Sequence, residues 1–397
     1  MTRTTKYDME HDQFADIRPY DDHLFKEKIA VLVREPGFEH AVRYVMPDVD
    51  YEAFVKNLLT VETQNDFQIK VMGPFLEMLA AATTHGVSMD GAENYISGPH
   101  VFVTNHRDIV LDASFLNLCF IRAKMPLTQV AIGNNLLIYD WITDLVKLNR
   151  SFIVKRDVKV REALDAATHL SQYIHHAVLD QKESIWIAQR EGRAKDSNDR
   201  TQESVVKMLS LGGKSENFID NLMELNIMPV AISYEYDPND YLKATEFLRR
   251  RRDPAYKKTK RDDLFSMETG LLRQKGRVHF HLGACINTSL EPLRDESRAE
   301  VAPKVCAVLD RSIHCGYRIY PCNYIAYDEV FGTSHLGSGY TEDDLKAFNE
   351  YLDKQLDKVE LTDVTPDERA FMRETMLVMY ANPLQNQKTA LTCGNAL

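Results

Sequence analysis

The residues best suited to chemistry lie where a short apolar segment ends in a polar corner. Residues 101–104 are Val-Phe-Val-Thr, a strand-forming run, and Asn-His-Arg-Asp follows at 105–108. A helix is predicted over 109–123, because apolar residues recur there at helical spacing and Asp108 suits its N-cap. His106 therefore lies at a strand-to-helix corner with carboxylates about one helical turn away. A histidine held by a carboxylate is suited to act as a general base.

Three further segments place charged or polar residues at the end of an apolar strand. They are 149–156, with Arg150, Lys155 and Arg156; 184–193, which ends in Glu191, Gly192 and Arg193; and 227–235, which ends in Ser-Tyr-Glu. The carboxyl ends of parallel strands share one edge of a sheet, where ligands bind, so these groups should converge on one cleft. Arginine offers a planar, permanently charged fork to phosphate oxygens. The pattern indicates a phosphate-bearing ligand.

The elements that must position these residues alternate between strand and helix. Apolar runs of strand length occur at 101–104, 127–132, 151–154, 184–188, 228–234 and 278–282. Helical spacing of apolar residues occurs at 109–123, 136–148, 158–179 and 202–211. This alternation predicts the α/β class, with a mainly parallel central sheet flanked by helices.

Changes in the pattern of apolar residues along the sequence predict three regions. Residues 1–86 read as a helical N-terminal region with a loose polar arm, and 87–290 as the α/β domain. Residues 291–397 read as a mostly helical C-terminal extension, whose polar tail from 384 onward is expected to fray.

Composition narrows the class of protein. Hydrophobic residues make up 44% of the 397 and charged residues 27%, as in an ordinary globular protein. The net charge of −11 argues against nucleic acid as a partner. Six scattered cysteines without a C-x-x-C pair favour a reducing compartment, so a cytoplasmic protein is expected. No run of about 18 apolar residues is present, and the first ten residues lack the apolar core of a signal peptide. Any contact with a membrane would be at its inner surface.

Together, the four strand ends resemble the glycerophospholipid acyltransferase superfamily, which includes the bacterial glycerol-3-phosphate and 1-acylglycerol-3-phosphate acyltransferases. That family carries N-H-x-S-x-x-D after a strand, then an Arg-bearing strand, then F-x-E-G-x-R-S, then a V-P-V strand. The same order occurs here at Asn105-His106, at 151–156, at 191–193 and at 228–230. The resemblance covers about 87–290, and the long helical N-terminal region is more similar to the glycerol-3-phosphate branch.

One departure from the family pattern concerns the aspartate that supports the histidine. The family places it five residues after the histidine, where this chain has Leu111, whereas Asp112 and Asp108 lie six and two residues after His106. If Asp108 caps the helix, Asp112 must swing by about 100° to reach the ring, the angle of one helical residue. A distorted first turn would permit this. We prefer Asp112, and Asp108 remains the alternative.

The resemblance implies acyl transfer from acyl-CoA or acyl carrier protein to a hydroxyl of glycerol 3-phosphate, without a metal or other cofactor. His106 would be the base, and Asp112 or Asp108 would hold its ring. The residues implied in acceptor binding are Arg150, Lys155, Arg156, Glu191, Gly192 and Arg193. Lysophosphatidate or an amine is an alternative acceptor. A catalytically silent module that binds lipid or carrier protein is the alternative of a different class.

Two other features need a role. Residues 249–261 carry eight cations in thirteen positions. They form either a solvated helix end or, as we prefer in so acidic a chain, a dock for anionic lipid headgroups, an acidic carrier protein or coenzyme A phosphates. His279 and His281 share one face of a predicted strand. They are either a metal-binding pair or, as we prefer, part of a polar sheet face.

Overall fold

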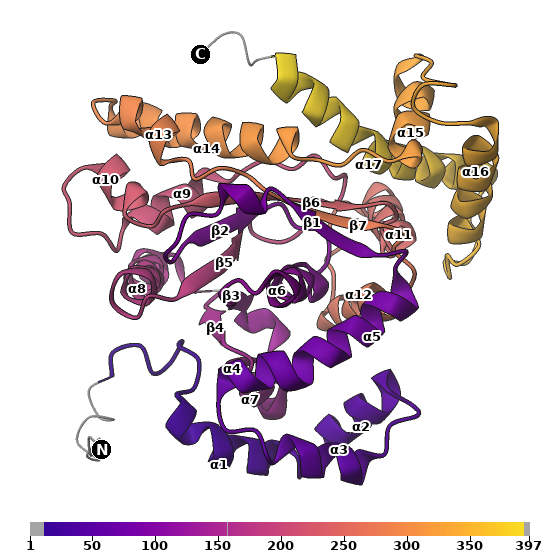
Figure 1. Ribbon diagram of the computed structural model, residues 1–397. Coiled ribbons are helices and arrows are strands. Elements are labelled where there is room, and N and C mark those ends of the chain that lie inside the picture. Colours follow the sequence, from indigo (N-terminus) through magenta and orange to yellow (C-terminus); the bar gives the residue numbers. More distant parts are fainter. Residues whose placement is uncertain (1–11, 157, 393–397) are drawn as a thin grey trace.

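A seven-stranded sheet forms the centre of the computed structural model, which describes residues 12–156 and 158–392 (Figure 1). The strand order is β1-β7-β6-β2-β5-β3-β4. Strands β2 to β6 run in one direction, while β1 and β7 run in the other, because β6 and β7 pair antiparallel. The strands are β1 (Val87–Asp90), β2 (Val101–Thr104), β3 (Thr128–Gly133), β4 (Ser151–Val154), β5 (Ser184–Ala188), β6 (Met228–Tyr234) and β7 (Val278–Leu282).

The predicted α/β class with a mainly parallel sheet is confirmed. All six predicted strands are present, within one residue of their predicted ends. The sequence did not predict β1 or the reversal at β7. Strand β1 is four residues long at the edge of the sheet, and half of it is exposed, so its Val-Ser-Met-Asp sequence has no continuous apolar run.

Both faces of the sheet are covered by helices, which explains why the parallel strands read as continuous apolar runs. Phe102 packs on one face against α5 (Gly73–Thr83) and α6 (Leu111–Ala123). Its neighbours Val101 and Val103 point to the other face, as strand geometry requires. The helices that share this second core are α8 (Ala163–His175), α9 (Glu203–Ser210), α10 (Phe218–Met223) and α14 (Arg298–Cys315).

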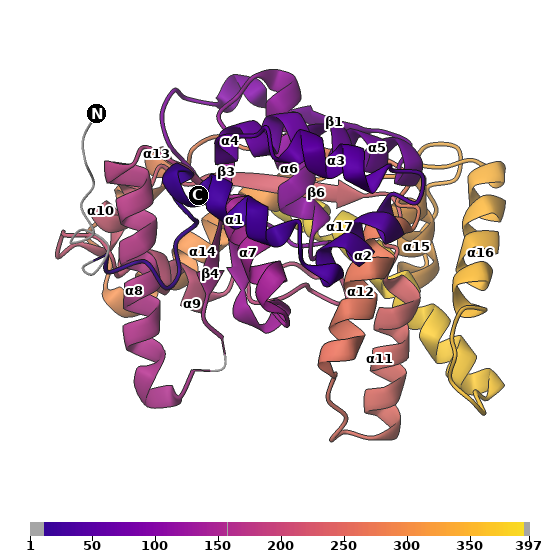
Figure 2. The same ribbon diagram turned by 90° about the horizontal axis from the view of Figure 1, so that it is seen from below.

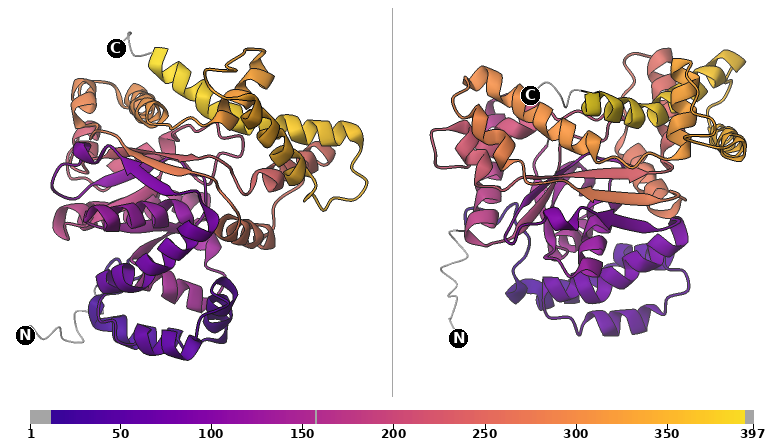
Figure 3. Two further views of the ribbon diagram at one scale, coloured as in Figure 1. Left: turned by 45° about the vertical axis from the view of Figure 1, so that its right-hand side comes forward. Right: turned by 45° about the horizontal axis from the view of Figure 1, so that its top comes forward.

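The N-terminal helices form a separate small core on the opposite side of the sheet from α14 and α17 (Figure 3). They are α1 (Asp22–Leu32), α2 (Pro36–Val45), α3 (Tyr51–Leu58) and α4 (Gln64–Phe67), followed by a π-helical turn at Gln68–Met72. Their core includes Leu148 of α7 (Asp140–Leu148), the helix before β4. In the two described ranges, no helix has both the length and the apolar character needed to span a bilayer.

The C-terminal helices form a further core. They are α15 (Pro321–Phe331), α16 (Glu342–Leu356) and α17 (Pro366–Thr392), whereas the short α13 (Asn287–Leu290) packs into the core of α8 and α14 through Leu290. The prediction of a frayed tail from 384 was wrong for 384–392, which continue α17. Leu384, Asn386 and Ala390 are buried there, and Leu384 belongs to the core of the C-terminal helices. Packing of sparse apolar side chains thus holds a helix that its polar composition does not indicate. Residues 393–397 of that tail lie outside the described residues.

Two helices between β6 and β7 were not predicted: α11 (Asp240–Arg252) and α12 (Lys260–Leu272). They lie side by side and project on the same side of the molecule as α8 (Figure 2). The 3-10 turns are Ala92–Asn94, Asn134–Leu136, Val160–Glu162 and Glu291–Leu293, and a second π-helical turn spans His176–Asp180.

Candidate active site

The corner after β2 is tied to the neighbouring strand by Asn105. Backbone pairing between β2 and β6 reaches Thr104 and Val230. Beyond it, the buried Asn105 amide donates to the Ile232 carbonyl (2.9 Å) and accepts from the Ile232 N–H (2.7 Å). The side chain therefore extends the ladder by one step while the main chain turns away. These two hydrogen bonds explain why an asparagine precedes His106.

His106 is oriented by Asp112. The ring Nδ1 lies 2.8 Å from Asp112 Oδ2, and the ring of Trp186 packs edge-on at 5.8 Å between centroids. The same carboxylate oxygen accepts the backbone N–H groups of Arg107 (2.6 Å) and Asp108 (3.0 Å). Asp112 is fully buried and has no access to water, so the ring of His106 and the two backbone N–H groups fix the orientation of its carboxylate. This arrangement fixes the tautomer that leaves Nε2 of His106 to accept a proton.

Asp108 has different partners. Its Oδ1 accepts the backbone N–H groups of Val110 (2.9 Å) and Leu111 (2.8 Å), where α6 begins. Burial, and secondarily the charge of Asp112, raise the pKa of Asp108. Because α6 begins at Leu111 rather than at the predicted 109, Asp112 is its second residue and can turn back toward His106. Of the two aspartates that the sequence left open, Asp112 is the one in contact with the ring.

Arg107 ties the His106 corner to the loop after β5. Its guanidinium is 7% exposed and lies 2.8 Å from the Asp199 carboxylate. Asp199 also accepts from the hydroxyl of Tyr317 (2.6 Å), just after α14. The loop after β5 and the end of α14 thereby hold the residue next to His106. No local signal in the sequence links these positions, which are about a hundred residues apart or more.

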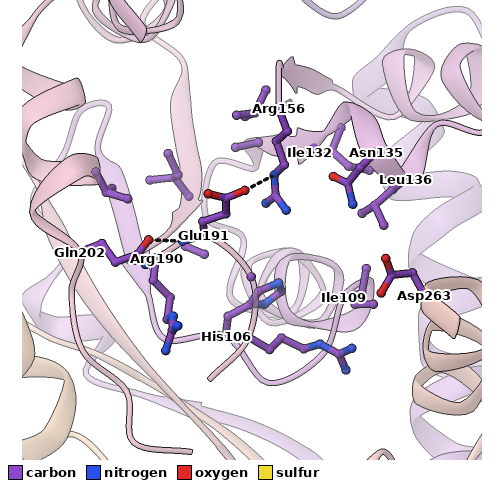
Figure 4. Close-up of a pocket in the computed structure, with 18 of the residues that line it drawn as sticks. His106, Ile109, Ile132, Asn135, Leu136, Arg156, Arg190, Glu191, Gln202 and Asp263 are labelled. Carbon is purple, nitrogen blue, oxygen red and sulfur yellow. Dashed lines mark hydrogen bonds and ion pairs between the residues drawn. The ribbon is translucent and has the colours of Figure 1, made fainter. Parts of the chain in front are cut away.

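A cavity of about 920 Å³ opens at His106, over the carboxyl ends of β2, β3, β4 and β5 (Figure 4). One wall is apolar and is built from α8, α9 and the ends of β3 and β4. Its side chains are Ile132, Val154, Ala163, Ala166, Ala167, Leu170, Val205 and Met208, and Leu136 of the 3-10 turn after β3 adds a further apolar group to the lining. A wall of this kind can hold a hydrocarbon chain.

The rest of the lining is strongly cationic. Lys155, Arg156, Arg190, Arg193, Lys195, Lys243, Arg250 and Lys258 line the cavity, whereas its acidic side chains are Glu191, Asp196, Glu246 and Asp263. Cations outnumber carboxylates two to one in a chain whose net charge is −11. The cavity is therefore a focus of positive potential, suited to an anionic ligand.

Five of the six predicted acceptor-binding residues lie in this lining. Arg156 Nε is 3.8 Å from Glu191 Oε1, across the mouth of the cavity (Figure 4). Lys155 pairs with Asp16 at 2.5 Å. Gly192 has φ +68°, the left-handed conformation that glycine adopts without strain, so the chain reverses between Glu191 and Arg193.

The sixth predicted residue, Arg150, is not brought to the cavity. It precedes β4 and so lies at the amino end of that strand, whereas Lys155 and Arg156 follow its carboxyl end. Its guanidinium pairs with Glu183, which precedes β5 at the same edge. The prediction ignored strand direction: only the carboxyl ends of β4 and β5 face His106.

Several cavity residues were missed at the sequence level. Arg190 and Lys195 flank the Glu-Gly-Arg turn in the sequence, so their place in the lining could have been predicted from that turn. Arg250 and Lys258 belong to the 249–261 cluster, and Lys243 had no signal. Arg251 and Arg252 of the same cluster do not line the cavity. They pair with Asp367 and Glu368 of α17, at 3.3 and 2.6 Å.

His279 and His281 lie on β7 and share one carboxylate. His281 Nδ1 is 2.6 Å from Asp90 Oδ1, and His279 Nε2 is 3.1 Å from Asp90 Oδ2. Asp90 also pairs with Arg318 at 3.3 Å. Within the described parts of the chain, no set of three or more His, Cys, Asp or Glu side chains is arranged to hold a metal ion.

Comparison with known proteins gives similarity to solved structures only. No protein-family model matches the sequence. No curated protein matches it either. Among solved structures, this chain is similar to the 1-acyl-sn-glycerophosphate (LPA) acyltransferase PlsC from Thermotoga maritima. The superposition covers 74% of this chain and 95% of the PlsC chain, with 13% sequence identity and a TM-score of 0.33.

Proposed function

We propose that this protein transfers a fatty acyl group from a thioester to a hydroxyl of a phosphate-bearing acceptor, and that the acceptor is glycerol 3-phosphate. One observation carries the proposal: the His106–Asp112 pair opens into a single cavity that is apolar on one wall and cationic on the other. A base between these two walls suits a reaction that joins a hydrocarbon chain to a phosphorylated alcohol.

In the proposed reaction, His106 Nε2 takes the proton of the acceptor hydroxyl while that oxygen attacks the thioester carbonyl. The tetrahedral intermediate collapses, the C–S bond breaks, and the departing thiolate takes the proton back from the imidazolium. The acceptor oxygen is itself the nucleophile, so no covalent acyl-enzyme is formed. Asp112 holds the tautomer and stabilises the imidazolium, as the aspartate does in hydrolase triads.

The two walls divide the substrates. The apolar wall along α8 takes the acyl chain, and Arg156, Arg190 and Arg193 at the strand ends take the phosphate of the acceptor. Arg190 Nε and Arg193 Nη1 are buried donors without a hydrogen-bond partner among the described residues. Buried donors of this kind are costly unless a ligand satisfies them, which favours an anion in this position.

The test is a thiol-release assay with palmitoyl-CoA and a panel of acceptors: glycerol 3-phosphate, lysophosphatidate and an amino acid. We expect release with glycerol 3-phosphate, and a loss of at least about 10³-fold in His106→Ala, the scale for removing a catalytic base. His281→Ala is the matched control, because His281 also pairs with an aspartate but lies on β7 outside the cavity lining. Release in His106→Ala at the parent rate, or no release with any acceptor, would contradict the proposal.

A further inference from the structure

Helix α11 and its N-cap residue Asn239 present a stripe of polar side chains to the cavity, beside the apolar Leu242 and Phe247. Asn239, Lys243, Glu246 and Arg250 line it at spacings of four, three and four residues, which places them on a single helical face. At the helical rise of 1.5 Å per residue, the stripe extends for about 16 Å from Asn239 to Arg250. None of these residues belongs to the four motifs around the strand ends, and the proposed acceptor site does not use them.

The stripe begins beside the His106 corner. Asn239 Nδ2 lies 3.3 Å from the position that a Cβ on Gly270 of α12 would occupy, and Asp108 Oδ2 lies closer still to that position. Asn239 is 1% exposed, and neither atom of its amide has a hydrogen-bond partner among the described residues. A buried amide with a free donor and a free acceptor is costly unless a ligand satisfies it. Another amide group would satisfy both.

The stripe ends in a group of cations. Glu246, which is 4% exposed, contacts Lys195 Nζ, Arg250 Nη2 (2.8 Å) and Lys258 Nζ (3.9 Å). Lys258 also pairs with Asp263 at 3.2 Å. Burial, and then the charges of Arg250, Lys258 and Arg193, lower the pKa of Lys195 to about 7. Near neutral pH the fixed positive charge of this group therefore comes from Arg250 and Lys258, and a bound anion would favour the charged form of Lys195.

We propose that this stripe binds the coenzyme A portion of the acyl donor. Asn239 pairs with an amide of the pantetheine arm, and Lys195, Arg250 and Lys258 bind the phosphates of the nucleotide. The inference rests on the proposed function, because His106 marks the position of the thioester. From the amide nitrogen nearer the sulfur to the first phosphorus, the pantetheine arm has about 10 bonds, or about 12 Å when extended. The three cations gather around Glu246, which lies seven residues, or about 10 Å, along the helix from Asn239.

The charges favour coenzyme A over a carrier protein as the donor. Both carry a pantetheine arm, but coenzyme A ends in a diphosphate and a 3′-phosphate, whereas the arm of a carrier protein ends in a single phosphodiester. Three clustered cations fit the more highly charged ligand. The strand-end arginines remain available for the acceptor, so donor and acceptor can occupy the cavity together.

Desulfo-coenzyme A, which cannot react, provides a binding test by isothermal titration calorimetry. We expect Arg250→Gln and Lys258→Gln each to weaken its binding at least about tenfold, the effect of losing one charge-assisted contact. Arg251→Gln is the matched control: it removes the adjacent arginine, which pairs with Asp367 outside the cavity lining, and should change the affinity less than about twofold. Absence of binding to the parent, or parent affinity in both cavity variants, would overturn the proposal.

Kinetics separate failure of this site from failure of the proposed function. In Arg250→Gln, KM should rise for palmitoyl-CoA but stay unchanged for palmitoyl-pantetheine, which lacks the nucleotide, and for the acceptor. If desulfo-coenzyme A binding depends on Arg250 while no thioester reacts, the coenzyme A site stands and acyl transfer fails. If transfer depends on His106 while KM for palmitoyl-CoA is unchanged in Arg250→Gln, acyl transfer stands and the coenzyme A site fails.

Discussion

At the scale of the residue, the corner after β2 assigns two nearby aspartates to different tasks. Asp112 gathers the His106 ring and two backbone N–H groups on one carboxylate oxygen. Asp108 accepts two backbone N–H groups at the start of α6 and does not contact the ring. The first task requires a negative charge near the imidazole. The second requires only an oxygen that accepts hydrogen bonds.

This difference predicts that the same substitution lowers kcat far more at Asp112 than at Asp108. Asp112→Asn should lower kcat by about 10³-fold or more, since an amide cannot stabilise the imidazolium. Asp108→Asn should leave kcat within about tenfold, and the midpoint of urea unfolding nearly unchanged, because asparagine caps helices as well as aspartate does. Steady-state kinetics of the two variants decide the matter. A larger kcat loss in Asp108→Asn than in Asp112→Asn would mean that Asp108 supports the base.

At the scale of the element, α12 approaches the corner closely because it carries a glycine there. The ideal Cβ of an alanine at Gly270 would collide with Asp108 Oδ2, a buried atom just before the start of α6. The helix therefore supports the His106 corner from the side of the cavity that α11 and α12 form. Two helices that the sequence left unpredicted are part of the site's framework.

Gly270→Ala should therefore destabilise the protein by about 1–3 kcal/mol, the usual cost of overpacking, and reduce kcat as Asp108 shifts. Gly73→Ala in α5 is the matched control, because a Cβ there meets its nearest neighbours at 3.5 Å, an ordinary contact. That variant should be neutral or slightly more stable. Urea unfolding of both variants measures the difference, and equal stabilities would show that α12 does not depend on this glycine.

At the scale of the whole molecule, the cavity is assembled from segments far apart in the chain. The strand ends and the segments that follow them carry five of the eight cations of the lining, and α8 with α9 forms the apolar wall. Helix α11 and the loop after it supply the other three cations. Helices α8, α11 and α12 project on the same side of the molecule (Figure 2). The proposed substrates are divided between the walls, so a change in one wall should alter the use of only one part of the donor.

Ala167→Phe on α8 tests this division. The larger ring would fill part of the apolar wall and exclude about two methylene groups of the chain, each worth about 0.8 kcal/mol when buried. The ratio of kcat/KM for palmitoyl-CoA to that for octanoyl-CoA should then fall at least about tenfold. Desulfo-coenzyme A affinity should stay at the parent value. An unchanged ratio would place the acyl chain elsewhere.

Most of the sheet was predictable because its strands are buried on both faces, which leaves a continuous apolar signal in each. Strand β1 and the tail of α17 were not predictable, because they are stabilised by packing against distant parts of the chain, which no local pattern indicates. Helix α11 combines four terminal arginines with a stripe that faces a cavity, so its sequence reads as a solvated charged segment. Contacts of this kind depend on the whole chain.

The sequence by itself determined that His106 follows a strand and that charged residues end the neighbouring strands. Because parallel strands share one edge for their carboxyl ends, this was enough to predict a common cleft, whatever the strand order. Only the tertiary structure decided which aspartate contacts the ring, since that depends on the residue at which α6 begins. It also removed Arg150 from the cavity and added α11, because strand direction and packing of remote helices are properties of the folded chain.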